Sequence, residues 1–90
     1  MGAELPVDYD PAKDAENQRK HGVSLELGRS VLDGAATTMI DDRFIYGEER
    51  FVTFGYVDDR LYVAVYTLRS DSLRMISVRK ANAREQTLYG

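Results

Sequence analysis

The stretch RFVTFGYVDDRLYVAVYTL, residues 50–68, decides the fold of this chain. Residues 50–57 and 61–68 are rich in β-branched and aromatic side chains, which favour strands. The Asp-Asp-Arg sequence between them is short enough for a hairpin connection. The stretch therefore predicts two adjacent antiparallel strands.

Further strands are predicted on both sides of this hairpin. LRMISVRK, at 73–80, follows a Ser-Asp-Ser turn and is a third strong strand. ATTMID, at 36–41, is a candidate strand before the hairpin, and RFIYGEE, at 43–49, is predicted to be a loop or an irregular edge. LPVDY, at 5–9, is predicted to be a short edge strand, where proline is tolerated because an edge N–H needs no partner.

Two helices are predicted near the N-terminus. Asp10 can act as an N-cap and Pro11 suits the first helical position, so a helix is expected over 11–21. Gly22 ends it, because glycine adopts a left-handed cap at the least cost. A serine directly before 25–32 can cap a second helix.

The C-terminus predicts a third, short helix. Asn82, with Glu85 three residues later, resembles a capping box for a helix over 83–89. The order of elements is β-α-α-β-β-β-β-α, which is typical of an α+β fold. We expect one domain over 1–90, with a mainly antiparallel sheet of four or five strands and the two N-terminal helices on one face.

Composition excludes several classes of protein. Ninety residues suffice for one small domain. The chain has no cysteine and one histidine, so a thiolate or histidine-rich metal site is not expected. No apolar run approaches the roughly 20 residues of a membrane span, and the N-terminus lacks the regions of a signal peptide. We expect a soluble cytoplasmic protein without a membrane partner.

The charges are distributed unevenly. Residues 1–42 hold nine acidic and four basic residues, whereas 43–90 hold eight basic and six acidic ones. Nine of the twelve basic residues are arginine, whose planar fork suits phosphate, although codon bias also explains such an excess. A net charge of −3 argues against a protein that binds nucleic acid over its whole surface. Any contact with nucleic acid is therefore expected to be local.

Alternation along the strands groups candidate site residues. Period two predicts that Leu73, Met75, Ser77 and Arg79 form one row on the last strand. The preceding strand has a similar row that ends at Thr67 and Arg69. Whether the two rows share a sheet face depends on hairpin register, because a slip of one residue would separate them.

The first predicted helix carries a polar stripe. Lys13, Asn17, Lys20 and His21 are spaced so that they lie along one side of it. The stripe either lines a cleft or is simply solvated. His21 also suits a helix C-terminus, where a histidine can cap carbonyls and interact favourably with the helix dipole.

No phosphate-binding glycine loop, metal-ligand cluster or nucleophile motif is recognisable. Three ordered blocks do resemble the BrnT family of toxins: DPAKDAENQRKHGVSLELG at 10–28, GEERFVTFG at 47–55 and RMISVRKANAREQTLY at 74–89. The chain departs from the family at residues 7–9, Val-Asp-Tyr, where an aromatic residue and a tryptophan are common. It also departs at Val78, which is often alanine.

The resemblance implies a RelE-like fold and a ribonuclease toxin of a type II toxin–antitoxin system. It implies metal-independent cleavage of RNA, inhibition of translation and no cofactor. The implied partner is an antitoxin with a ribbon-helix-helix domain, and operator DNA would be bound only through the complex of toxin and antitoxin.

Family position and residue type suggest roles for individual side chains. Arg50 and Arg79 are expected to stabilise the charge that grows on the phosphate. His21 is the expected proton carrier, with Lys13 or Tyr89 as substitutes. Weaker candidates for contact with the RNA backbone are Lys20, Arg69 and Lys80.

Two other classes of function remain open. A non-catalytic module that binds a partner chain within a regulatory complex would suit the tyrosines Tyr46, Tyr56, Tyr62 and Tyr66, which can serve an interface. A regulator that binds DNA directly is disfavoured, because the chain is acidic and lacks a recognisable helix-turn-helix pattern.

Overall fold

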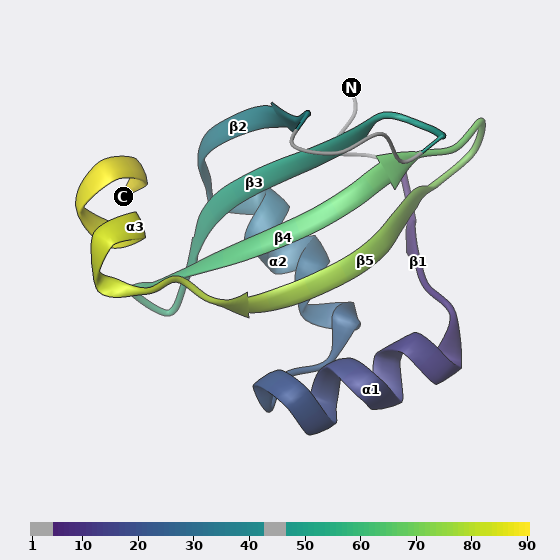
Figure 1. Ribbon diagram of the computed structural model, residues 1–90, viewed down its shortest axis with the longest axis horizontal. Helices are drawn as coiled ribbons and strands as arrows, with labels where there is room; N and C mark the ends of the chain where they lie inside the picture. Colours follow the sequence, from purple (N-terminus) through teal and green to yellow (C-terminus); the bar gives the residue numbers. More distant parts are fainter. Residues whose placement is uncertain (1–4, 43–46) are drawn as a thin grey trace.

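The computed structural model describes residues 5–42 and 47–90, and its centre is a five-stranded sheet in the order β1-β5-β4-β3-β2 (Figure 1). The strands are β1 (Val7–Asp8), β2 (Ala35–Asp41), β3 (Arg50–Val57), β4 (Arg60–Leu68) and β5 (Leu73–Lys80). β1 runs parallel to β5, and all other neighbours are antiparallel. The structure confirms the predicted α+β class and the mainly antiparallel sheet. Residues 43–46 of the predicted loop lie outside the described residues.

The central hairpin joins β3 to β4 by a two-residue turn. Val57 lies opposite Arg60, so the turn consists of Asp58 and Asp59. Both have positive φ, 50° and 65°. Such a turn matches the right-handed twist of the flanking strands, and aspartate tolerates left-handed backbone better than most residues. The predicted connection was one residue longer.

In the described part of the chain, four helical segments accompany the sheet: α1 (Pro11–His21), η2 (Leu25–Leu27), α2 (Gly28–Asp33) and α3 (Ala83–Tyr89). Asp10 accepts a hydrogen bond from the N–H of Ala12, and Gly22 ends α1 with φ of 74°, as the sequence predicts. The helix predicted over 25–32 begins instead as the 3₁₀ turn η2 before α2. Where the two meet, a Cβ on Gly28 would lie only 2.5 Å from Met75 Sδ, so the chain packs tightly against β5 there.

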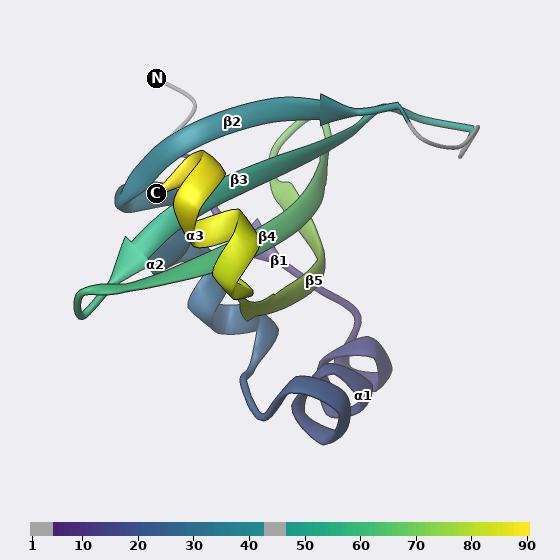
Figure 2. The same cartoon turned by 60° about the vertical axis from the view of Figure 1, so that its left-hand side comes forward.

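The sheet has two unlike faces. One is covered by η2 and α2 and holds the main core: Leu25, Val31, Ala64, Tyr66, Leu73, Met75 and Val78. The opposite face, which we call the open face, holds a smaller cluster: Phe54, Leu61, Val63 and Ala81. α1 lies beside the β5 edge, while α3 crosses one end of the sheet (Figures 1 and 2).

A β-bulge at Ile76 divides β5 into two registers. Val65 lies opposite Ser77, but the next residue, Tyr66, lies opposite Met75. Ile76 is therefore the extra residue, and the alternation of side chains reverses across it.

The bulge makes one sequence prediction wrong. Leu73 and Met75 are buried in the main core, whereas Arg79 lies opposite Val63 and shares the open face with it. Ser77, opposite Val65, lies on that open face too. The predicted row of four residues on one face is thus two rows on two faces, because period two holds only without an inserted residue.

β1 pairs only with the first two residues of β5, and farther along this edge a side chain of α1 forms hydrogen bonds with the β5 backbone. Asn17 is 5% exposed, and its Nδ2 donates to the carbonyls of Val78 at 2.8 Å and Val23 at 2.9 Å. Its Oδ1 accepts from the Val78 N–H at 3.2 Å. The amide thus replaces a neighbouring strand for one residue of β5 and fixes α1 against the sheet.

A second side chain of α1 fixes the segment that follows. Asp14 accepts hydrogen bonds from the Leu25 N–H at 2.7 Å and from Ser24 Oγ at 2.9 Å. The bond from Leu25, with smaller contributions from Ser24 and Gln18, lowers the pKa of the Asp14 carboxyl despite partial desolvation. Asp14 and Asn17 therefore join α1, η2 and β5 into one unit.

We predict that Asn17→Ala will lower the free energy of unfolding by about 2–4 kcal/mol, because it leaves buried backbone groups of Val78 without partners. Denaturant unfolding followed by circular dichroism measures the change. Gln18→Ala is the control: Gln18 is exposed and its side chain donates only to Asp14 among the described contacts, so a change within about 0.5 kcal/mol is expected. Equal stability of both variants would show that Asn17 does not hold the edge.

Candidate functional site

A polar groove runs between α1 and the β5 side of the sheet. It consists of two hollows that share Lys13 and Ile76, and we call it the basic groove. Its lining residues are Asp10, Lys13, Glu16, Asn17, Lys20, His21, Glu48, Arg50, Arg69, Arg74, Met75, Ile76 and Ser77. Five are lysine or arginine and three are acidic, so the groove is locally positive in a chain whose net charge is −3.

α1 supplies one wall of the basic groove. Lys13, Lys20 and His21 are exposed, whereas Asn17 between them is buried against β5. Because these positions share one side of the helix, docking through Asn17 turns Lys13 and Lys20 toward the groove. The polar stripe predicted from the sequence therefore lines a cleft.

The opposite wall is built from three strand ends. β3 begins at Arg50, β4 ends just before Arg69, and Arg74 is the second residue of β5. Antiparallel pairing brings these three termini to the same end of the sheet. The meander thus gathers guanidinium groups that lie up to 24 residues apart in the sequence.

Local ion pairs orient two of these arginines. Arg74 Nε donates to Asp8 Oδ1 at 2.8 Å, and Ser72 Oγ donates to the other oxygen of Asp8 at 3.1 Å. The hydrogen bond from Arg74 is the largest cause that lowers the pKa of Asp8. Arg69 Nη2 lies 3.6 Å from Glu48 Oε2, and the two side chains are 48% and 42% exposed.

Arg74 is a groove residue that the sequence analysis did not assign to the site. Arg74 is the first residue of the third block that resembles the BrnT pattern, and this resemblance was the one signal in the sequence that could have assigned it to the site. Its place in the groove was hidden because the bulge at Ile76 reverses the alternation between Arg74 and Arg79. In a strand without a bulge, Arg74 and Arg79 would lie on opposite faces of the sheet, because they are five residues apart.

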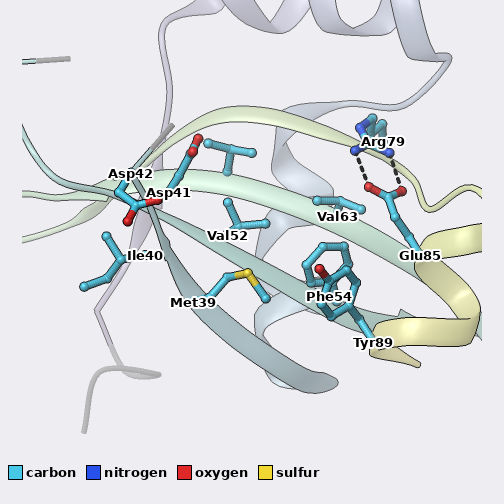
Figure 3. A pocket seen from close by; sticks show the side chains of 11 residues that line it. Met39, Ile40, Asp41, Asp42, Val52, Phe54, Val63, Arg79, Glu85 and Tyr89 are labelled. Atoms are coloured by element: carbon cyan, nitrogen blue, oxygen red, sulfur yellow. Dashed lines mark hydrogen bonds and ion pairs between the residues drawn. The ribbon is translucent and has the colours of Figure 1, made fainter. Parts of the chain in front are cut away.

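A second depression lies on the open face, between β2 and α3. This apolar hollow has a volume of about 260 Å³ and is shown in Figure 3. Its lining residues are Met39, Ile40, Asp41, Asp42, Val52, Phe54, Val63, Val65, Arg79, Glu85 and Tyr89. The basic groove and the apolar hollow are neighbours, because Val65 of the hollow lies opposite Ser77 of the groove.

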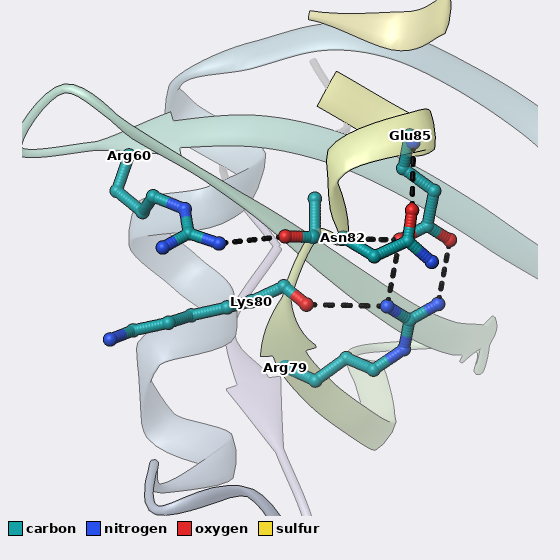
Figure 4. A network of polar contacts seen from close by, with 6 residues as sticks. Arg60, Arg79, Lys80, Asn82 and Glu85 are labelled. Carbon is teal, nitrogen blue, oxygen red and sulfur yellow. Dashed lines mark hydrogen bonds and ion pairs between the residues drawn. The ribbon is translucent and has the colours of Figure 1, made fainter. Parts of the chain in front are cut away.

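Arg79 is bound tightly to the start of α3. Its Nη1 and Nη2 donate to the two carboxylate oxygens of Glu85, each at 2.8 Å, and Nη1 also reaches the Lys80 carbonyl (Figure 4). Glu85 Oε1 also accepts from the Asn82 N–H, as the second half of the predicted capping box. The hydrogen bond from Arg79 is the largest cause that lowers the pKa of Glu85.

Tyr89 and Lys80 lie outside the basic groove. The Tyr89 ring stacks on Phe54, with centroids 4.2 Å apart, and the Tyr89 carbonyl accepts from Thr37 Oγ1 at 3.3 Å. Lys80 is exposed, and its side chain extends away from the Arg79–Glu85 pair in Figure 4.

The candidate residues of the sequence analysis therefore divide into three sets. The basic groove brings together Lys13, Lys20, His21, Arg50 and Arg69. The apolar hollow contains Arg79 and Tyr89, and neither depression includes Lys80.

Two further properties of the described chain bear on function. Between 5–42 and 47–90, no three or more histidine, cysteine or acidic side chains are grouped so that they could hold a metal ion. Over the same residues, no helix has the length and apolar character needed to cross a membrane.

Comparison with known proteins identifies the family of most of the chain. Residues 9–85 match the model of a family described as the ribonuclease toxin, BrnT, of a type II toxin–antitoxin system. This range includes every residue of the basic groove. No curated protein matches the chain significantly.

The Arg79–Glu85 pair predicts an acid-sensitive attachment of α3. The pKa of Glu85 in the folded protein is lower than its usual 4.5. The ion pair therefore contributes its full stabilisation above pH 4.5, and this stabilisation is lost as the pH falls through the lower pKa of the folded state. Glu85→Gln should therefore lower the melting temperature at pH 7, and the difference from the parent protein should shrink below about pH 4.5. Melting measured from pH 7 to pH 3 tests this. A difference that is constant over this range would contradict it.

Proposed function

The chain belongs to the BrnT family of ribonuclease toxins of type II toxin–antitoxin systems, and we propose that it is an endoribonuclease that cleaves RNA in the basic groove without a metal ion. The family implies an RNA substrate and an antitoxin partner. The placement of the reaction in the basic groove, the roles of individual residues and the independence from metal are our proposal.

The convergence of cationic side chains carries this proposal. Arg50, Arg69 and Arg74 from the strands face Lys13 and Lys20 from α1 across one groove. A phosphodiester brings negative charge, and its transition state concentrates more of it on the phosphoryl oxygens. Preorganised donors at such a place commonly account for the largest part of catalysis, on the order of 10²–10³ in rate for each donor.

The proposed reaction uses the 2′-hydroxyl of the RNA as the nucleophile. Its oxygen forms a bond to phosphorus, the bond from phosphorus to the 5′-oxygen breaks, and the products are a 2′,3′-cyclic phosphate and a 5′-hydroxyl. One proton leaves the 2′-oxygen and one reaches the 5′-oxygen. The substrate supplies the nucleophile, so the protein needs only charge stabilisation and proton transfer.

The residues of the basic groove suit these two tasks. Arg50 and Arg74 offer guanidinium groups for the phosphate, and Lys20 and Arg69 extend the positive surface along the RNA backbone. The imidazole of His21 can donate or accept a proton, and it lies exposed at the end of α1 on the groove. We assign proton transfer to His21, with Lys13 at the junction of the two hollows as its nearest substitute.

Arg79 and Tyr89 receive a different role in this proposal. The two terminal nitrogens of Arg79 that could clamp a phosphate already donate to Glu85, and the Tyr89 ring packs on Phe54. We propose that both hold α3 on the sheet. Arg79→Ala and Glu85→Ala should then lower the melting temperature by similar amounts. Both variants should leave the rate of RNA cleavage in the groove unchanged. Loss of cleavage in Arg79→Ala alone would return Arg79 to the phosphate role.

The proposed partner is an antitoxin with a ribbon-helix-helix domain, which neutralises the toxin in the cytoplasm and carries the complex to operator DNA. The alternative, a partner-binding module without catalysis, drew on four tyrosines. Tyr46 lies outside the described residues, and of the other three only Tyr56 is exposed, while Tyr66 is buried in the main core. The tyrosines therefore give no surface that favours this alternative.

We predict that purified protein, freed of antitoxin, will cleave RNA in the presence of EDTA and leave 2′,3′-cyclic phosphate and 5′-hydroxyl ends. His21→Ala should reduce the cleavage rate by about 10²–10⁴ while the melting temperature stays within a few degrees, because its side chain is exposed. Product-end analysis and single-turnover cleavage are the measurements. Cleavage abolished by EDTA and restored by a divalent metal would contradict the mechanism.

Two adjacent basic residues of α1 test whether RNA binds in the basic groove. Lys20 lines the groove, whereas Arg19 does not, and its side chain is 72% exposed beside Glu16. Lys20→Ala should weaken RNA binding and lower the salt dependence of binding, because one phosphate contact is lost. Arg19→Ala removes the same charge and should change neither. Equal effects of both variants would place the RNA elsewhere.

A further inference from the structure

The middle of the open face is apolar but is not covered by another element. Val52 of β3 and Val65 of β4 lie opposite each other on two inner strands of the sheet, and both side chains are only half-buried. The next pair along these strands, Thr53 and Ala64, faces the main core and is 0% exposed. η2 and α2 cover that other face, whereas α3 crosses only one end of the open face (Figures 1 and 2). The apolar hollow is therefore an unfilled position at the middle of the sheet.

β3 connects the apolar hollow to the basic groove. Arg50, Val52 and Phe54 are alternate residues of this strand, so they share the open face. Arg50 lines the basic groove, whereas Val52 and Phe54 line the hollow. Residues two positions apart in a strand are separated by about 6.6 Å. A nucleotide extends over a similar distance from its phosphate to its base, so a phosphate bound at Arg50 brings a base within reach of Val52.

The walls of the hollow suit a planar ring. The stacked rings of Phe54 and Tyr89 bound it on the α3 side, and Met39, which is 37% exposed, bounds it on the β2 side (Figure 3). Its volume of about 260 Å³ is just below the roughly 300–1,000 Å³ of common small-molecule pockets, so it has room for one ring system. Unpaired nucleobases commonly pack on aromatic and apolar side chains. A base of the RNA therefore matches the hollow in shape and polarity.

The carboxylates around the hollow do not oppose this occupant. Glu85 accepts two hydrogen bonds from Arg79, and Asp41 is 7% exposed and already has an interaction within the protein. Asp42 is exposed, but a nucleobase is uncharged and is not repelled by a carboxylate. The negative phosphates stay with the basic side chains of the groove. The two neighbouring depressions therefore suit the two parts of one nucleotide.

We propose that the apolar hollow holds one base of the RNA substrate, next to the phosphate that is bound in the basic groove. The proposal rests on the proposed function, because that function supplies the RNA. The base packs against Val52 and Val65, beside the Phe54–Tyr89 pair. A base that is stacked and paired in a double helix is not free to enter the hollow, so this subsite selects single-stranded RNA.

The test separates contacts with bases from contacts with the backbone. One probe is a short single-stranded oligonucleotide with 2′-O-methyl groups, which lacks the proposed nucleophile and is not cleaved. The other probe is the same backbone without bases. Val52→Gln places a neutral polar side chain in the hollow, and it should weaken binding of the complete oligonucleotide by about fivefold or more, as expected for the loss of one packed base. Binding of the abasic oligonucleotide should not change.

A second variant and two controls complete the comparison. Met39→Gln also changes the hollow, and it should act in the same direction without affecting folding, because Met39 is exposed on the edge strand β2. Leu68→Gln introduces the same amide at a residue that is 56% exposed and lines none of the depressions described above, so it should leave both affinities unchanged. Lys20→Ala should weaken binding of both probes by the same factor, because it removes a backbone contact.

Each outcome decides for or against the proposal. If the parent protein does not distinguish the complete from the abasic oligonucleotide, or binds neither, the proposal is overturned. Equal weakening of both probes by Val52→Gln and Met39→Gln overturns it too. Weaker binding of the antitoxin by these variants with unchanged affinity for both oligonucleotides also overturns it and assigns the hollow to a protein partner. A preference for the complete oligonucleotide that both variants lose, in a protein that cleaves no RNA, would support the base subsite and refute the proposed function alone.

Discussion

The pairing of one side-chain amide with one residue of β5 supports both the fold and the candidate site. Asn17 satisfies the N–H and the carbonyl of Val78, so β5 needs no strand neighbour at that point. Because the amide is buried, the loss of these bonds would leave polar groups without water. The bonds also fix the rotation of α1 about its axis, which determines that Lys13 and Lys20 point into the basic groove. The same bonds that stabilise the sheet edge therefore place the cationic wall of the site.

Local signals made most of the secondary structure predictable from the sequence. Asp10, Gly22 and the Asn82–Glu85 box satisfy helix-end groups through neighbouring residues, so the sequence pattern contains the whole interaction. The strands over 50–57, 61–68 and 73–80 were predictable for a similar reason, since their composition is unambiguous. The 3₁₀ start of the second helix was not, because it depends on the close approach of Gly28 to Met75 on β5.

The candidate site was predictable in its residue types and only partly in its geometry. Alternation assigns faces correctly within an uninterrupted strand, but nothing in the sequence of β5 marks Ile76 as an inserted residue. The bulge separates Met75 from Ser77 and brings Arg74 to the groove. Similarly, the sequence indicated that Glu85 would cap α3, but its second task of binding Arg79 depends on how α3 meets the sheet. A motif arginine is equally suited to a phosphate and to a carboxylate, and only the fold decides which one it meets.

The open face and its borders separate two kinds of charge over a short distance. The basic groove lies along the α1 side, while Asp41 and Asp42 of the apolar hollow lie at the end of β2. The negative field of the rest of the chain limits RNA binding at other places, since exposed charges act over about 10 Å at 0.1 M salt. The net charge of −3 is therefore compatible with a nucleic-acid substrate, because the groove alone has to be positive.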